Sequence, residues 1–326
     1  MAGAFVRVAV VGAGYMGGGI AQSFAAHGID CDVADESAQR ARERVQRLHE
    51  EAGEFAADGL LPPRMADAVR EHLRAADSLE SAVDGAGYVA EAVPERVDMK
   101  SAVLERISAN VGRDVVIGTN TSAIPIGELA SNVTAPERFL GVHWMNPAPF
   151  VPSVEVIPAA GTGSSVVEHV VELLRSVGKV PTVVGDSPGF VANRLQYALF
   201  REAARLVEEG VAAPAQVDEV VRNSFGFRLP FFGPFAIADI AGLDVYRDGF
   251  TTLEAAYGER IGTPHLLTDQ VERGRHGLKS GQGFYEFTDG LGAEVARHRD
   301  RAYAELNRLR ERLGRVELRE QADPPR

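Results

Sequence analysis

A histidine and a carboxylate stand out in the apolar stretch GVHWMNPAPFVPSVEV, which covers residues 141–156. His143 lies near its start and Glu155 near its end, each in or beside a segment predicted to be a buried strand. Burying an ionisable group is costly unless it finds a partner. A histidine titrates near neutral pH and can accept a hydroxyl proton, while a carboxylate behind it can orient the ring. The two residue types therefore suit general acid–base chemistry, although His143 taken alone is better explained as a satisfied core histidine.

A glycine-rich turn near the N-terminus suits phosphate binding. Its G-x-G-x-x-G pattern follows a β-rich run at residues 6–11 and precedes a helical pattern that extends to about residue 27. The first glycine permits a tight turn, the second lets a pyrophosphate approach the backbone, and the third allows close packing of helix and strand. Asp35 ends the next predicted strand, where a carboxylate binds a ribose 2′-hydroxyl and repels a 2′-phosphate. This context favours NAD over NADP, whereas a glycine-rich turn without a cofactor is the alternative. The predicted cofactor contacts in this region are Gly12, Gly14, Tyr15, Met16, Gly17 and Asp35.

The elements that must position these residues alternate between strands and helices. After a region predicted to be helical from 37 to 80, strand-like runs alternate with helical patterns. The runs lie at 87–93, 114–120, 139–144, 153–158 and 179–186, and the helical patterns at 97–110, 124–131 and 164–177. Such alternation predicts an α/β fold with a Rossmann-type, doubly wound, mostly parallel sheet. Ligands bind beyond the carboxyl ends of the strands in such sheets. Those ends carry Asp35, Glu95, Asn120, Ser122 and His143.

The second half of the chain predicts an all-α domain. Ser187 and Pro188 resemble the N-cap and first residue of a helix with Val191, Leu195, Leu199, Ala203 and Leu206 on one face. We predict an NAD-binding domain at 1–187, a helical substrate and dimerisation domain at 188–288, and a helical tail at 289–326 with a disordered end. The apolar stretch at 225–246 would leave a large exposed patch on a monomer and so predicts a homodimer. The tail places Val295, Ala302, Leu306, Leu309 and Leu313 on one face, which predicts that it docks on a domain or on a partner subunit.

Composition excludes several other classes of protein. The chain has 326 residues, of which 45% are hydrophobic and 25% charged, and a net charge of −12. This charge argues against nucleic acid or an anionic membrane as the main partner. With one cysteine, Cys31, the chain can form neither an internal disulfide nor a cysteine cage for a metal, and no metal site is predicted. No signal peptide and no apolar run of about 18 residues is found, so we expect a cytoplasmic protein.

Several motifs in order resemble the L-3-hydroxyacyl-CoA dehydrogenase family. They are GAGYMGGGIA, EAVPE, TNTSA, HWMNP followed by VEV, SPGFVANR, GPF followed by an aspartate and by GLD, and GLKSGQGFYEF. Together they extend to about residue 288. The segment NRLQYALFREAARLVEEG and the tail are also similar to the lambda-crystallin and L-gulonate dehydrogenase branch. The resemblance implies reversible NAD-dependent oxidation of a 3-hydroxyacyl-CoA to the 3-ketoacyl product, as in fatty acid metabolism.

The resemblance also assigns roles to residues. His143 matches the catalytic base and Glu155 its carboxylate partner, while Ser122 and Asn193 match the residues that bond the reacting oxygen. Two further residues, Glu95 and Lys100, match positions near the cofactor. Asn120 is included among the cofactor contacts, and Asn146, in the active-site loop, is expected to bind substrate together with Ser122 and Asn193.

Alternatives concern the enzyme class and the substrate. The β-hydroxyacid dehydrogenases share the glycine turn but use a lysine four residues before an asparagine, where this chain has Gly189. A catalytically silent, crystallin-like NAD-binding protein is a second alternative. CoA-specific members carry lysines where this chain has Glu50, Glu51 and Glu54, although arginines at 40, 44 and 47 form a nearby face. The acyl group could therefore be carried by CoA or by an acyl carrier protein, or the substrate could be a free 3-hydroxy acid such as L-gulonate.

Overall fold

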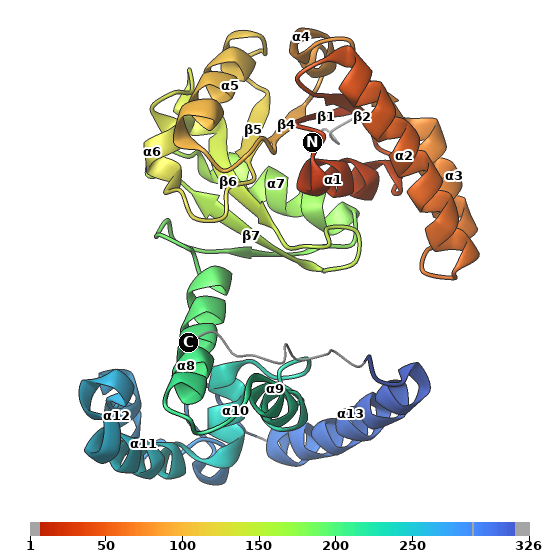
Figure 1. The fold of residues 1–326 in the computed structure, drawn as a ribbon. Helices are drawn as coiled ribbons and strands as arrows, with labels where there is room; N and C mark the ends of the chain where they lie inside the picture. Colours follow the sequence, from red (N-terminus) through yellow and green to blue (C-terminus); the bar gives the residue numbers. More distant parts are fainter. Residues whose placement is uncertain (1–6, 289, 317–326) are drawn as a thin grey trace. The chain divides into compact units, whose positions relative to one another are not determined.

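The computed structural model describes residues 7–288 and 290–316, and the chain divides into two compact units (Figure 1). The first unit extends to Ala198 and the second begins at Leu199. The first is built on one mostly parallel sheet and the second on helices, as the sequence predicts.

The sheet of the first unit has eight strands in the order β3-β2-β1-β4-β5-β6-β7-β8. Neighbouring strands are parallel except for β6 and β7, which are antiparallel. The sheet is therefore doubly wound and mostly parallel. The strands are β1 (Arg7–Val11), β2 (Asp30–Ala34), β3 (Leu73–Ala75), β4 (Tyr88–Glu91), β5 (Val116–Thr119), β6 (Phe139–Trp144), β7 (Ser153–Pro158) and β8 (Val180–Val183).

Helices cover both faces of this sheet, so side chains on both sides of β1 are buried. Val8 and Val10 pack in one apolar cluster and Ala9 and Val11 in another. Strands covered on both faces have continuous apolar sequences, which is why RVAVV shows no alternation. The first cluster includes side chains of α1 (Tyr15–Ala25), α2 (Ala38–Ala57), α3 (Pro63–His72) and α7 (Ser164–Ser176). The second includes side chains of α4 (Leu79–Val83), α5 (Val97–Ala109) and α6 (Ile126–Ala130).

One strand of the sheet contradicts the helical prediction for residues 37–80. Helix α3 ends at His72, and Leu73–Ala75 forms β3, which pairs in parallel with β2. The backbone of Leu73 is extended, and its side chain is buried in the core. Three residues are too few to give a periodic signal, so pairing with β2 decides their conformation.

The start of α8 also differs from the prediction. The helix spans Ala192–Glu208 rather than beginning at Pro188, because Gly189 and Phe190 have positive φ angles of 74° and 48°. This left-handed turn lets the Phe190 side chain pack in the core, where it is 1% exposed. The core contact therefore delays the helix by four residues and places Asn193 in its first turn.

The second unit is a set of helices with a small core of its own. Ala238, Leu243, Leu267 and Val271 form its buried cluster, with Phe284 and two other aromatic side chains packed against it. Its elements after α8 are α9 (Pro214–Asn223), α10 (Pro234–Ala241), α11 (Leu243–Tyr257), η2 (Gly258–Ile261), α12 (His265–Glu272), η3 (Leu278–Ser280) and α13 (Leu291–Leu313).

The tail helix α13 docks on the helical unit itself. The ring of Tyr303 lies 5.4 Å from that of Phe227 and 6.1 Å from that of Phe231. Arg310 lies over the ring of Phe227 and donates to the side-chain oxygen of Asn223 at 2.7 Å. The tail therefore contacts the helical unit, but the predicted apolar face is only partly covered, because Ala302 is buried whereas Leu309 and Leu313 are 38% and 74% exposed. The predicted disordered end at 320–326 lies outside the described residues.

Candidate active site

The glycine turn between β1 and α1 has the geometry that a dinucleotide needs. Gly12 has a φ angle of 101°, and a Cβ on Gly17 would lie 1.8 Å from the Gly12 carbonyl oxygen. In contrast, nothing lies within 4 Å of a Cβ built on Gly14. No side chain caps the start of α1, so its first amide groups can face a pyrophosphate. The residues of this turn therefore fit a dinucleotide.

Asp35 lies beside this turn, as the sequence predicts. Its carboxylate accepts a hydrogen bond of 2.7 Å from the amide of Ala13, and Arg40 lies 3.5 Å away. Tyr15 is exposed in the first turn of α1, and Met16 is half-buried. The carboxylate thus lies next to the predicted phosphate site, where a ribose would follow.

His143 and Glu155 face each other across the antiparallel pair β6–β7. They are direct partners in the strand register, and His143 Nδ1 lies 2.8 Å from Glu155 Oε2. Both are buried, with 5% and 4% of their surface exposed. The second carboxylate oxygen accepts 3.0 Å hydrogen bonds from the amides of Val191 and Ala192 at the start of α8. A helix N-terminus favours a negative charge, and the carboxylate at this place accepts the Nδ1 hydrogen of His143. His143 Nε2 is then the ring nitrogen that can accept a proton.

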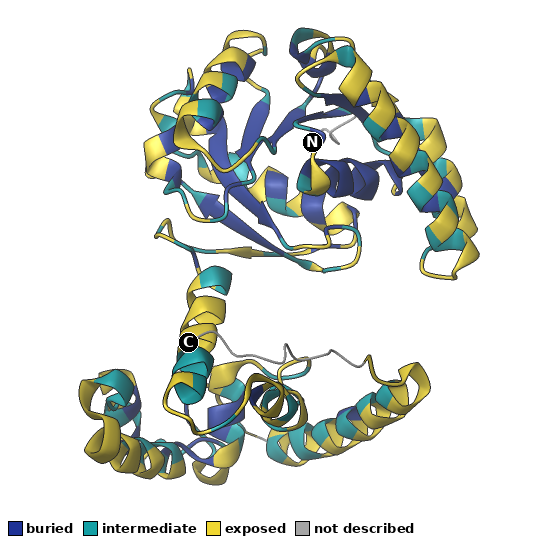
Figure 2. Ribbon diagram, in the orientation of Figure 1, coloured by how far each residue is buried: buried dark blue, intermediate teal, exposed yellow. Residues whose placement is uncertain are grey.

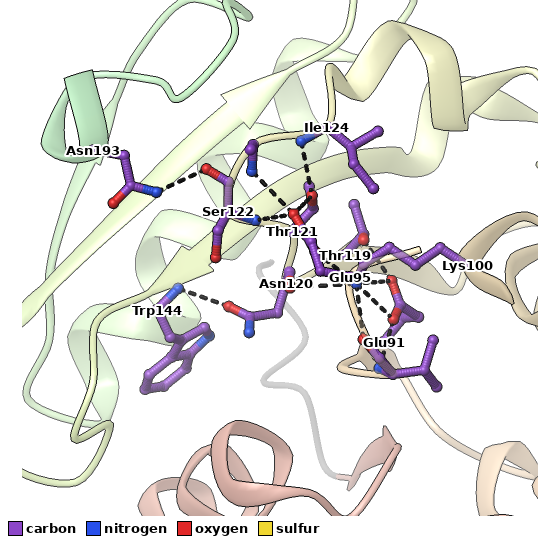
Figure 3. A network of polar contacts seen from close by, with 12 residues as sticks. Glu91, Glu95, Lys100, Thr119, Asn120, Thr121, Ser122, Ile124, Trp144 and Asn193 are labelled. Carbon is purple, nitrogen blue, oxygen red and sulfur yellow. Dashed lines mark hydrogen bonds and ion pairs between the residues drawn. The ribbon is translucent and has the colours of Figure 1, made fainter. Parts of the chain in front are cut away.

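Two predicted oxygen-binding residues meet beside this pair. Asn193 Nδ2 donates a hydrogen bond of 2.9 Å to the backbone oxygen of Ser122 (Figure 3). The left-handed turn before α8 therefore serves two purposes: it offers amides to Glu155 and directs Asn193 toward Ser122.

Glu95 holds the loop that contains Ser122. Its Oε1 accepts hydrogen bonds from Thr121 Oγ1 at 2.6 Å, from the Ser122 amide at 2.8 Å and from the Ala123 amide at 3.0 Å (Figure 3). Partial burial opposes ionisation of Glu95, but these hydrogen bonds and the charge of Lys100 outweigh it and lower the pKa of the carboxyl group. Glu95 therefore contributes to the site by fixing the loop that carries Ser122.

Lys100, predicted near the cofactor, is fully buried beneath the same loop. Its Nζ lies 3.0 Å from Glu91 Oε1 and donates to the backbone oxygens of Val93 at 3.2 Å and Asn120 at 3.4 Å. Glu91 is not among the site residues predicted from the sequence, although an acidic residue at the end of the apolar strand YVAE is a signal for it. Its carboxylate also accepts a hydrogen bond of 2.5 Å from Thr119 Oγ1 (Figure 3). The Glu91–Lys100 pair thus supports the ends of β4 and β5.

Two asparagines complete the predicted set. Asn120 Oδ1 accepts a hydrogen bond of 2.9 Å from the Trp144 amide, which joins the ends of β5 and β6. Asn146 is exposed in the loop after β6. Every predicted site residue lies in the first unit. Most follow the carboxyl ends of parallel strands, whereas Glu155 lies on the antiparallel strand β7, Lys100 lies in α5 and Asn193 lies at the start of α8.

Two further features of the described residues concern metals and membranes. Residues 7–288 and 290–316 contain no group of three or more histidine, cysteine, aspartate or glutamate side chains placed to hold a metal ion. Across the same ranges, no helix has the length and apolarity needed to cross a membrane.

The doubly wound sheet and the glycine turn define a dinucleotide-binding α/β unit, which a helical unit follows in the chain. Residues 7–187 match the family model "3-hydroxyacyl-CoA dehydrogenase, NAD binding domain", and residues 189–287 match the corresponding C-terminal domain. The chain belongs to the 3-hydroxyacyl-CoA dehydrogenase family.

Relatives in this family differ in their substrates. A 5-formyl-3-hydroxy-2-methylpyridine 4-carboxylate 5-dehydrogenase of Mesorhizobium japonicum is 36% identical, over 89% of this chain and 95% of the relative. A probable 3-hydroxybutyryl-CoA dehydrogenase of Bacillus subtilis is 34% identical, over 87% of this chain and 98% of the relative. The solved 3-hydroxyacyl-CoA dehydrogenase of Archaeoglobus fulgidus is 30% identical with a TM-score of 0.78, over 93% of this chain and 98% of that one.

Proposed function

We propose that this chain oxidises the 3-hydroxyl group of a 3-hydroxyacyl-CoA to a ketone, and catalyses the reverse reduction, with His143 as the base. The observation that carries the proposal is the buried His143–Glu155 pair, whose carboxylate is also bonded to the start of α8. A buried histidine without such a partner would be a packing residue. With it, the imidazolium that forms when the base takes a proton is stabilised.

The residues of the site divide the work as follows. His143 Nε2 takes the proton of the substrate hydroxyl, and Glu155 stabilises the resulting imidazolium. NAD, held at the glycine turn and Asp35, supplies the hydride acceptor when bound. An amide NH₂ group has two hydrogens, and Asn193 uses one on the Ser122 backbone. Its other hydrogen and the Ser122 hydroxyl are then directed at the substrate oxygen as it changes from hydroxyl to carbonyl.

CoA is proposed as the carrier because TNTSA and GLKSGQGFYEF resemble the CoA-dependent members, and because the Bacillus subtilis relative is named as one of them. The test is a substrate panel with NAD or NADH. It compares acetoacetyl-CoA, the same acyl group on an acyl carrier protein, L-gulonate, and the pyridine compound named for the Mesorhizobium relative. Turnover of acetoacetyl-CoA at least about tenfold more efficient than that of the others supports the proposal. Tight NAD binding without any turnover would instead support the silent, crystallin-like alternative.

A carrier-free substrate is the second candidate, and a specific observation favours it. The three arginines that would bind a CoA phosphate are already paired within α2 and just before it. Arg40 donates to Glu36 at 2.8 Å, and Arg44 and Arg47 both donate to Glu51, at 3.1 and 3.2 Å. A phosphate would have to compete with these carboxylates. Under this candidate, the pyridine compound or L-gulonate would be turned over in preference to acetoacetyl-CoA.

We also propose that the chain is a homodimer that associates through the helical unit. Helix α8 buries none of its side chains, although Leu199 and Phe200 belong to it and are exposed at 43% and 68%. Val245 on α11 is also 58% exposed. Apolar surface of this extent is typical of an interface. Sedimentation at micromolar concentration tests the proposal, and a monomer there would reject it.

A further inference from the structure

Lys179 is a buried cation that the proposed reaction does not use. It directly precedes β8, and 7% of its surface is exposed. Its Nζ donates to the backbone oxygens of Ala148 at 2.5 Å, Val151 at 3.0 Å and Pro149 at 3.4 Å. None of the ion pairs among residues 7–288 and 290–316 includes it. A buried ammonium group without a carboxylate is costly, and burial lowers the pKa of Lys179.

The three carbonyl groups belong to one loop, residues 145–152, between β6 and β7. These two strands carry His143 and Glu155, and the loop carries Asn146. Lys179 also lies 5.5 Å from the centre of the Trp144 ring, next to His143 in sequence. The ammonium group therefore faces both the beginning and the far end of the loop.

The other surfaces of this loop touch the helices that flank the cofactor turn. A Cβ on Gly19 of α1 would lie 3.2 Å from the Ala148 Cβ and 3.2 Å from Pro149 Cδ. The ring of Phe150 lies 5.0 Å from that of Phe55 on α2. The loop is thus fixed by Lys179 on one side and by α1 and α2 on others.

We propose that Lys179 is a positioning residue that fixes the loop at 145–152, and with it Asn146, for substrate binding. The inference rests on the proposed function, because it takes the site around His143 as the substrate site. Three charge-assisted hydrogen bonds to one loop restrict its conformations, and a loop held in place loses less entropy when substrate binds. Without the ammonium group, the same three carbonyl groups would lose their donor, and the loop would sample other conformations.

The test compares Lys179→Met with a matched control, Arg138→Met. Arg138 is 3% exposed and also donates to backbone oxygens, including those of Ser108 at 3.1 Å and Thr134 at 3.2 Å. Arg138 directly precedes β6. It therefore lies at the amino end of that strand, whereas His143 lies near its carboxyl end. Both changes remove a buried cation from carbonyl acceptors, so both should lower stability. Only Lys179→Met should speed amide hydrogen exchange at 145–152 and raise the substrate KM by about tenfold or more.

A second variant perturbs the loop without removing a hydrogen bond. Gly19→Ala favours helix α1 intrinsically but crowds Ala148 and Pro149. It should raise the substrate KM while the gain in helix propensity offsets part of the cost of crowding, so the melting temperature should fall less than in Lys179→Met. The affinity for NAD should stay within about twofold in Lys179→Met, because Lys179 touches none of the predicted cofactor residues.

The outcomes separate this inference from the proposed function. Unchanged exchange at 145–152 in Lys179→Met, or an equal rise in KM for Arg138→Met, would overturn the role of Lys179 even if the enzyme is active. A wild-type chain that turns over no substrate in the panel would overturn the proposed function instead. Faster exchange confined to this loop in Lys179→Met would still be measurable in that case. It would support the proposal that Lys179 fixes the loop.

Discussion

The two units differ in how completely they cover their own apolar residues. All six residues of β6 in the first unit are buried, whereas α8, which leads into the second, has no buried residue (Figure 2). Yet α8 and the stretch at 225–246 are rich in apolar side chains. The central strands of the first unit are therefore covered, although Val180 on the edge strand β8 is 61% exposed, and the predicted site residues all belong to this unit. The second presents surface that another protein surface would cover, which is the physical basis for the proposed dimer.

The largest expected effect tests the proposed base in the first unit. His143→Ala should lower kcat by about 10²- to 10⁴-fold, because it removes the proposed base. NAD affinity should stay near that of the wild type, since the cofactor is expected at Gly12, Gly14 and Asp35. Steady-state kinetics and NAD titration measure the two quantities. A parallel loss of NAD binding would mean that His143 supports the fold rather than the reaction.

The next effect tests the surface of the second unit. Phe200→Glu should weaken dimerisation by about 10- to 100-fold, because it puts a charge in a proposed apolar interface. The matched control is Val180→Glu on β8, which is 61% exposed in the first unit and should leave the association unchanged. Sedimentation over a range of concentrations measures both. Equal dimer affinity in the two variants would contradict the proposal that the second unit forms the interface.

A smaller effect concerns cofactor choice in the first unit. Asp35→Ala should narrow the preference for NAD over NADP by about tenfold, because the carboxylate no longer repels a 2′-phosphate. Arg40, 3.5 Å from Asp35, would then lose one of its two carboxylate neighbours and keep Glu36 at 2.8 Å. The ratio of kcat/KM for the two cofactors measures the change. A wild-type enzyme that already prefers NADP would contradict the role given to Asp35.

The smallest effect is a pH dependence at Glu95. Because the folded pKa of Glu95 is lowered, this carboxylate stabilises the fold above the usual carboxyl pKa of about 4.3, and the contribution is lost as pH falls through the folded pKa. Glu95→Gln should therefore lose less stability than the wild type as pH falls below about 5. Thermal melts between neutral and acidic pH measure the difference. Parallel acid transitions in the two proteins would show that Glu95 adds no such dependence.

The sequence predicts the regular parts of the first unit well, because they follow from short-range patterns. The glycine turn, the alternation of strands and helices, and the positions of His143 and Glu155 on neighbouring strands follow from composition and spacing. Their direct pairing depends on the β6–β7 register, which the structure provides. It was the family resemblance, rather than spacing, that assigned roles to Ser122 and Asn193.

What the sequence could not predict depends on contacts between distant segments. Strand β3 exists because three residues pair with β2, and the late start of α8 follows from burial of Phe190. Glu91 and Lys179 are single polar residues at strand ends, and their partners lie up to 31 residues away. No local period distinguishes such residues from solvent-exposed ones, so only the assembled fold shows that they are buried.

The central claim is that Glu155 assists His143 in catalysis, and Glu155→Gln tests it most directly. The variant keeps the shape and a hydrogen-bonding group but removes the negative charge that stabilises imidazolium. We predict slower oxidation, and a rising limb of the pH–rate profile that moves to lower pH, because the base without its anion stays unprotonated in more acidic solution. A Glu155→Gln enzyme with the wild-type rate and an unmoved profile would contradict the claim and make His143 a packing residue.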